Sequence, residues 1–118
     1  MLVIVLASGA AHVAYRAWWL PSWRSWPSEP FSADKWRSTS ENGRHIFWKD
    51  LRSRSLLVGA ARQDVIDLLG PPSSDAGLYL TYVVKDRDAR EYTFNFVYLI
   101  QLNLDEAGRV TRAFIRHD

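Results

Sequence analysis

The chain has 118 residues, of which 47% are hydrophobic and 24% are charged, and its formal net charge is +2. These values are typical of one folded domain rather than a disordered chain, and the acidic and basic residues are too evenly mixed to indicate a nucleic-acid partner. The absence of cysteine excludes disulfides, thiolate catalysis, cysteine-ligated metals and a lipid-modified N-terminal cysteine.

Residues 1–20 are predicted to be a signal sequence or a membrane anchor. An apolar run is followed by small residues at positions 7–11, and the first charged residue is Arg16. A secretory signal cleaved near residues 8–10 fits this pattern, although no basic residue precedes the apolar run. An uncleaved spanning helix also fits, with an interfacial aromatic belt formed by Trp18, Trp19, Trp23 and Trp26. A helix of the folded domain is the third alternative. Cleavage and membrane orientation stay open.

Residues 21–30 are expected to form an extended linker, because prolines alternate with serines there. The folded domain is then expected to occupy residues 31–118. Ser32 is a candidate N-cap for a first structured stretch. The spacing of Ile46 and Leu51 predicts the first main helix over residues 41–54.

A second helix of about two turns is predicted before residue 70. Its wide apolar face comes from Val65, Ile66, Leu68 and Leu69. Gly70 is suited to close a helix, and the prolines at positions 71 and 72 cannot continue one. Ala61 stands where Ser or Thr is preferred as N-cap, which should cost about 1 kcal/mol.

The rest of the chain alternates with a period of two and predicts three antiparallel strands. Alternation runs through residues 78–84 and 98–104, and a charged loop at residues 85–91 separates these stretches. Residues 105–108 have the composition of a hairpin turn that ends in glycine. Residues 110–116 return as an edge strand. The prediction is an α+β fold in which two helices pack on a three-stranded antiparallel sheet.

The segment from residue 57 to residue 72 resembles the helical signature of the BamE (SmpA/OmlA) family of small bacterial envelope proteins. Upstream, the order Phe31, Trp36, Arg44, Asp50-Leu51 and Leu56-Leu57-Val58-Gly59 is similar to some BamE-like lipoproteins, so the resemblance covers residues 31–116. This chain departs from the family at Ala61 and in lacking the lipidated cysteine. The structural signature residues are Gly59, Val65, Leu68, Leu69, Gly70 and Pro71.

The sequence offers no constellation for metal binding or catalysis. The three histidines, His12, His45 and His117, are far apart in the chain and lack ligand spacing. Asp86 and Asp88 lack the further ligands of a calcium loop. We therefore expect no cofactor and no enzyme activity. Only a pocket that holds His45 with Asp50 or Glu41 would support the alternative hypothesis of an enzyme.

Aromatic residues are the better candidates for function. They cluster around the loop after the first strand and along the next strand, and strict alternation places some of them opposite the core. Aromatic residues and arginine are enriched in the cores of protein interfaces. The candidate partner-binding residues are Tyr79, Tyr82, Arg87, Arg90, Tyr92, Phe94 and Tyr98.

The resemblance implies a non-enzymatic protein–protein interaction module that supports outer-membrane or envelope assembly. It places the domain in the periplasm or on the periplasmic face of the inner membrane, where it binds an envelope protein. Two alternatives remain. One is a secreted or tethered domain similar to inhibitors of β-lactamases, and the other is a structural protein associated with lipid or peptidoglycan. The oligomeric state stays open.

Overall fold

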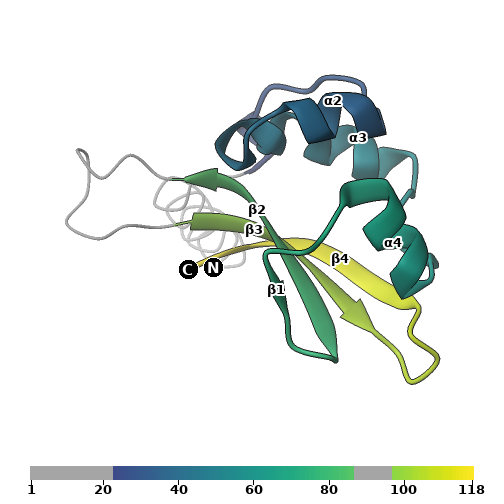
Figure 1. Ribbon diagram of the computed structural model, residues 1–118. Helices are drawn as coiled ribbons and strands as arrows, with labels where there is room; N and C mark the ends of the chain where they lie inside the picture. The colour runs from purple at the N-terminus through teal and green to yellow at the C-terminus, as the bar shows by residue number, and fades with distance from the viewer. Residues whose placement is uncertain (1–22, 87–96) are drawn as a thin grey trace, which may run out of the picture.

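The computed structural model describes residues 23–86 and 97–118. The helices lie on one face of an antiparallel sheet, so the fold is α+β, as predicted (Figure 1). The elements in chain order, with η for a 3₁₀-helix, are η1 (Trp23–Ser25), α2 (Ala33–Ser38), η2 (Glu41–Phe47), α3 (Trp48–Ser53), α4 (Arg62–Leu69), β1 (Ser74–Asp75), β2 (Tyr79–Asp86), β3 (Val97–Leu104) and β4 (Val110–His117).

The sheet has four strands in the order β1-β2-β3-β4, so the prediction of three strands was wrong by one. The additional strand, β1, pairs Ser74 with Thr81 and Asp75 with Leu80. Two residues are too few to show alternation, which is why the sequence pattern missed this strand. The prediction that the last strand lies at an edge is confirmed.

The prediction of two helices was also inexact. Residues 41–54, predicted as one helix, form a 3₁₀-helix up to Phe47 and an α-helix only from Trp48 onward. The Trp48 N–H donates to the His45 carbonyl, three residues back, and Gly43 weakens α-helical preference in this turn. Helix α2 is separate, and its predicted cap is confirmed because Ser32 Oγ accepts a hydrogen bond from Lys35 N at 3.1 Å.

The core lies between the helices and the sheet. The face of the sheet toward the helices carries alternate residues of β2 and β3, as the period of two predicted. The helical layer contributes mainly large aromatic side chains. The fully buried residues are Trp36, Trp48, Tyr82, Phe47, Leu51, Leu57, Leu69, Leu80, Ile100, Leu102, Val65 and Val84.

Residues 23–31, here called the strap, are bound to the domain rather than extended away from it. Trp26 is 7% exposed and packs edge-on against Tyr98 of β3, with ring centroids 5.4 Å apart. Lys49 Nζ donates to the carbonyls of Arg24 and Trp26 at 2.6 and 2.7 Å. The linker predicted over residues 21–30 is therefore part of the folded unit from residue 23 onward.

The tryptophans of the strap have packing partners within the domain. The ring of Trp23 meets Trp48 edge-on at 5.9 Å, and the guanidinium of Arg52 lies 5.1 Å from the Trp23 ring. Trp18 and Trp19, also expected in a membrane-interface belt, lie outside the described residues. Of the described helices, none is long and apolar enough to span a bilayer; the predicted signal or anchor at residues 1–20 lies outside the described part of the chain.

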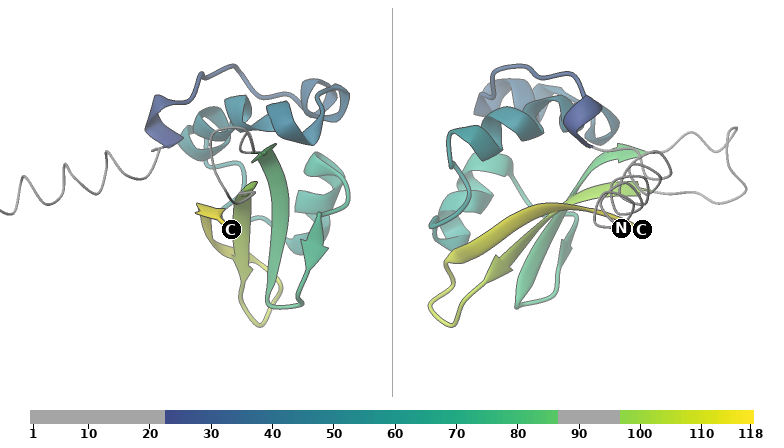
Figure 2. Two further views of the ribbon diagram at one scale, coloured as in Figure 1. Left: turned by 90° about the vertical axis from the view of Figure 1, so that its left-hand side faces the viewer. Right: turned by 180° about the vertical axis from the view of Figure 1, so that it is seen from behind.

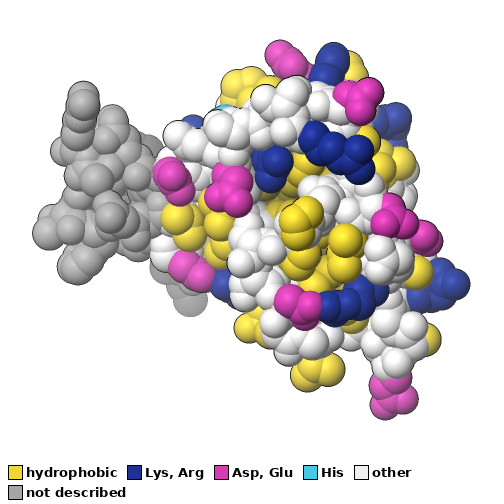
Figure 3. Space-filling model, in the orientation of Figure 1, with side chains coloured by type: hydrophobic (Ala, Val, Ile, Leu, Met, Phe, Trp, Pro, Cys, Tyr) yellow, Lys and Arg dark blue, Asp and Glu magenta, His cyan; other side chains and the backbone are white. Residues whose placement is uncertain are grey.

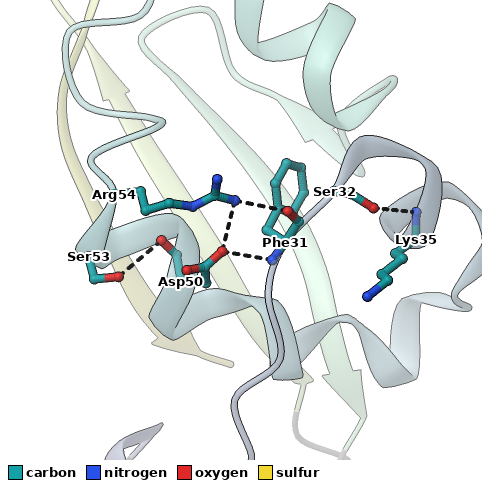
Figure 4. A network of polar contacts seen from close by, with 6 residues as sticks. All are labelled: Phe31, Ser32, Lys35, Asp50, Ser53 and Arg54. Carbon is teal, nitrogen blue, oxygen red and sulfur yellow. Dashed lines mark hydrogen bonds and ion pairs between the residues drawn. The ribbon is translucent and has the colours of Figure 1, made fainter.

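A polar network fixes the end of the strap to α3 (Figure 4). The Asp50 carboxylate accepts a hydrogen bond from Phe31 N at 2.7 Å and pairs with the Arg54 guanidinium at 2.8 Å. The same guanidinium donates to the Phe31 carbonyl at 2.9 Å. Both backbone polar groups of Phe31 are thus satisfied while its ring packs in the core.

Replacing Trp26 by Ala tests whether the strap belongs to the domain. Loss of a buried aromatic side chain should lower the free energy of unfolding by about 3 kcal/mol, measured by urea denaturation of the full chain. The control is Val58→Ala, at a side chain that is 52% exposed, where the change should stay within about 0.5 kcal/mol. A similar small change for Trp26→Ala would mean that the strap is only loosely attached.

Candidate interaction surface

The predicted signature segment forms α4 and the turns on either side of it. Val65 and Leu69 are buried in the core, and Leu68 is half-buried against it. Gly59 and Gly70 adopt φ angles of 91° and 84°, which favour glycine. Ala61 occupies the N-cap position and makes no side-chain cap, as expected. Pro71 is exposed.

The C-terminal end of α4 is held by side chains from other elements. Arg37 Nη2 donates to the Asp67 carbonyl at 2.6 Å, and Trp36 Nε1 donates to the Leu69 carbonyl at 2.8 Å. The Tyr82 hydroxyl donates to the Gly70 carbonyl at 2.9 Å. These bonds satisfy carbonyls that a helix end leaves without intrahelical partners. The signature segment therefore joins the helical layer to the sheet.

Two of the candidate partner-binding residues lie in the core instead of on an open surface. Tyr82 is 1% exposed and Tyr98 is 5% exposed. Alternation on β2 and β3 turns both side chains toward the helices, and burial raises the pKa of Tyr82 to about 12. Tyr79 has the opposite parity and is half-buried on the other face of the sheet. Arg87, Arg90, Tyr92 and Phe94 lie outside the described residues.

The face of the sheet opposite the helices, here called the open face, carries the remaining strand residues. The described helices all lie on the other side of the sheet (Figure 2). The strand register places Thr81, Gln101 and Phe114 in one row across the sheet, with Tyr79, Asn103 and Arg112 in a second row. The third row contains Val83, Leu99 and Arg116.

A chain of hydrogen bonds orders the polar side chains of the open face. Gln101 Nε2 donates to Asn103 Oδ1 at 2.8 Å, and Arg116 Nη1 donates to Gln101 Oε1 at 2.6 Å. The Arg116 guanidinium also contacts both carboxylate oxygens of Asp118, at 2.9 and 2.7 Å. This side-chain hydrogen bonding to Asp118 raises the pKa of Arg116 above its usual range. Arg116 is consequently held in one orientation.

Residues that the sequence analysis did not select complete this surface. The Arg112 guanidinium lies 4.4 Å from the centroid of the half-buried Phe114 ring, and Val83 on β2 is also half-buried. Alternation along residues 110–116 already placed Phe114 on the same side as Arg112 and Arg116, which is the signal that could have identified it. The open face thus combines an aromatic ring, aliphatic side chains and arginine.

His45 and Asp50 have different partners among the described residues. The His45 ring lies edge-on to Trp26, with centroids 5.3 Å apart, while the Asp50 carboxylate is bound by Phe31 and Arg54. Burial, and next the charge of Lys85, lowers the pKa of His45. Within residues 23–86 and 97–118, no group of three His, Asp or Glu side chains is placed to hold a metal ion.

A groove lies between the end of α2 and the end of α4. It has a volume of about 660 Å³ and is lined by Arg37, Ser38, Thr39, Ser40, Glu41, Arg44, Leu69, Gly70 and Pro71. Arg37 is engaged with the Asp67 carbonyl, and Arg44 Nε donates to the carbonyls of Trp36 and Thr39. In Figure 3, hydrophobic side chains gather in the middle of the molecule, with basic side chains toward α2. Because its arginines stabilise the fold, we assign this groove no ligand.

Comparisons with known proteins identify no relative of this chain: no protein-family model, no curated protein and no solved structure matches it. The BamE-like resemblance therefore stays a prediction that rests on the residues quoted above.

The Tyr82→Phe variant tests whether the Tyr82 hydroxyl is buried and hydrogen-bonded in the folded protein. At neutral pH, loss of the bond to Gly70 should lower the free energy of unfolding by about 1 kcal/mol. The folded-state pKa of about 12 lies above the unfolded value of about 10, so stability from neutral Tyr82 is present below pH 10 and is lost between pH 10 and 12.

Denaturation of both proteins at a series of pH values measures this effect. The wild type should be more stable than Tyr82→Phe by about 1 kcal/mol at pH 9 and less stable than the variant by about 1 kcal/mol at pH 12. The variant provides its own control, because all other titrating groups are shared. A difference that does not change with pH would show that the phenol is solvated in the folded protein.

Proposed function

We propose that this chain is a non-enzymatic protein–protein interaction module of the bacterial cell envelope, similar in role to BamE-like domains. The single observation that carries the binding role is the composition of the open face. Phe114, Tyr79 and Val83 lie only half-buried there, and Arg112 covers part of the Phe114 ring. Burial of such a surface against a partner stabilises the complex, because apolar groups are removed from water.

The geometry of the open face supports binding of a protein rather than a small molecule. Its side chains form rows across three strands of an antiparallel sheet instead of converging on a cavity. The side-chain hydrogen bonds that run from Asn103 to Asp118 hold the Arg116 side chain in place. Less conformational entropy of this side chain is therefore lost on binding. A broad, ordered surface is what a protein partner requires.

The envelope location rests on the sequence. The apolar segment at residues 1–20 supports export or membrane attachment, and the BamE-like pattern over residues 31–116 supports a periplasmic domain. The strap joins this N-terminal segment directly to the domain, since Trp26 packs in the core. We therefore propose that the partner is an envelope protein and that residues 1–20 bring the domain to the membrane.

Crosslinking followed by purification of the full-length protein from detergent-solubilised membranes tests the proposal. One envelope protein should co-purify, and Phe114→Ala should reduce its recovery at least about fivefold, as expected for an aromatic residue in an interface core. Leu78→Ala is the matched control, because Leu78 is 77% exposed and precedes β2. Equal recovery with Phe114→Ala and Leu78→Ala would exclude the open face as the docking surface.

An intact-mass measurement of the purified protein determines the form of its N-terminus. Retention of residues 1–20 together with a captured partner supports a membrane-attached module. A mature chain that begins after Ala10 and captures no partner would contradict the proposed role at the membrane.

A further inference from the structure

The outer edge of β4 carries backbone groups that point away from the sheet. Val97 and Asp118 exchange two hydrogen bonds, each 3.0 Å long. Hydrogen-bonded pairs alternate along an antiparallel ladder, so Phe114 and Arg116 also bond to β3. The N–H and C=O groups of Ala113, Ile115 and His117 therefore face outward. No other described backbone or side chain hydrogen-bonds to these outward groups.

On the opposite side of the sheet, local contacts cover the part of β2 that extends beyond the two residues of β1. Ser73 N donates to the Thr81 carbonyl at 2.8 Å, and Ser73 Oγ accepts from Val83 N at 2.9 Å. Further along β2, Asn42 Oδ1 accepts from Asp86 N at 2.7 Å. The two edges thus differ: β2 is covered by β1 and by polar side chains, whereas the described residues cover β4 only at its first residue.

The covering of β4 ends at Val110. Gly59 N donates to the Val110 carbonyl at 2.7 Å, and Val110 N donates to the Ala60 carbonyl at 2.9 Å. The strand continues to His117 at the edge of the sheet (Figure 2, right). A long open edge is a template for pairing with another extended chain.

A pocket lies beside the open part of this edge, on the side of the helices. Its volume is about 430 Å³, and it is lined by Leu51, Arg52, Ser53, Ser55, Leu57, Val58 and Ala113. Val58 is 52% exposed, and among the large hydrophobic side chains that the structure describes only Leu78 is exposed as well. A strand added next to β4 would direct alternate side chains toward this pocket.

The other side of the edge is basic. Arg112 is exposed and forms no ion pair with any described residue, whereas Arg116, four residues further along on the same face, is already paired with Asp118. Side chains of an added strand that do not face the pocket would lie beside these arginines. A carboxylate there would gain a charge-assisted hydrogen bond.

We propose that the β4 edge binds an extended segment of a partner protein in which apolar and acidic residues alternate, as a fifth strand of the sheet. The apolar residues face Val58 and Leu57, and a carboxylate faces Arg112. This inference rests on the proposed function as an interaction module and specifies how the partner is held. A second copy of this chain fits less well, because it would bring the same arginines to the edge.

Binding of a synthetic peptide to the full-length protein in detergent tests the proposal. The probe is a fluorescent octapeptide of alternating valine and glutamate, and the control peptide alternates valine and lysine. The glutamate peptide should bind with a dissociation constant at or below about 1 mM, and the lysine peptide at least about tenfold more weakly. Hydrogen exchange of residues 111–118 should slow on binding, because the outward amides gain partners.

Substitutions at one position separate backbone pairing from fold stability. Ala113→Pro removes an outward N–H and keeps the ladder to β3, as edge strands allow; it should weaken binding at least about tenfold. Ala113→Ser keeps the N–H and should stay within about twofold. If Ala113→Pro fails to fold, Arg112→Glu serves instead: it should reverse the preference between the two peptides, whereas Lys35→Glu on α2 should leave it unchanged.

Several results would overturn the inference. These are no binding of the glutamate peptide at about 1 mM, binding without slower exchange in residues 111–118, and a peptide-free dimer that Ala113→Pro abolishes, which would assign the edge to a second copy.

Capture of the envelope partner distinguishes the two proposals. If Ala113→Pro captures it normally while Phe114→Ala does not, the module stands and the edge inference fails. If the peptide binds the edge but no envelope protein is captured, the proposed function fails.

Discussion

The indole of Trp36 lies where the helical layer, the end of α4 and the sheet meet. It is fully buried, its N–H donates to the Leu69 carbonyl at 2.8 Å, and its ring lies 6.3 Å from that of Tyr82. The Tyr82 hydroxyl in turn binds the next carbonyl, that of Gly70. Two aromatic side chains from different layers thereby satisfy adjacent carbonyls at one helix end. This junction links the end of α4 to the covered face of β2.

Because the helices cover one face of the sheet, two other surfaces of the sheet can meet a partner: the open face and the β4 edge. The open face carries Phe114, Arg112 and an ordered Arg116, and the β4 edge carries outward backbone groups. Both surfaces include β4, so one partner segment can contact them together. On the opposite side of the sheet, the short strand β1 and the side chains of Ser73 and Asn42 cover backbone groups of β2. This asymmetry favours association on a single side of the molecule.

Local signals in the sequence were sufficient for several elements. The end of α4 at Gly70 and the cap at Ser32 were predicted correctly, because each depends on residues close in the chain. The two-residue strand β1 and the burial of Trp26 were missed, since both depend on contacts with distant strands. For the candidate site, alternation separated Tyr79 from Tyr82 but could not show which set the helices cover. That choice is made by tertiary packing.

The strap also determines how the domain is attached to whatever precedes it. Lys49 fixes the carbonyls of Arg24 and Trp26, and Glu29 N donates to the Ile46 carbonyl at 2.9 Å. The chain therefore enters the domain at a fixed point, η1. No flexible linker separates residue 23 from the core. A pulling force applied at that point would act directly on the packing of Trp26 before it reached the sheet. Tension applied at residue 23 is therefore expected to lower the stability of the core.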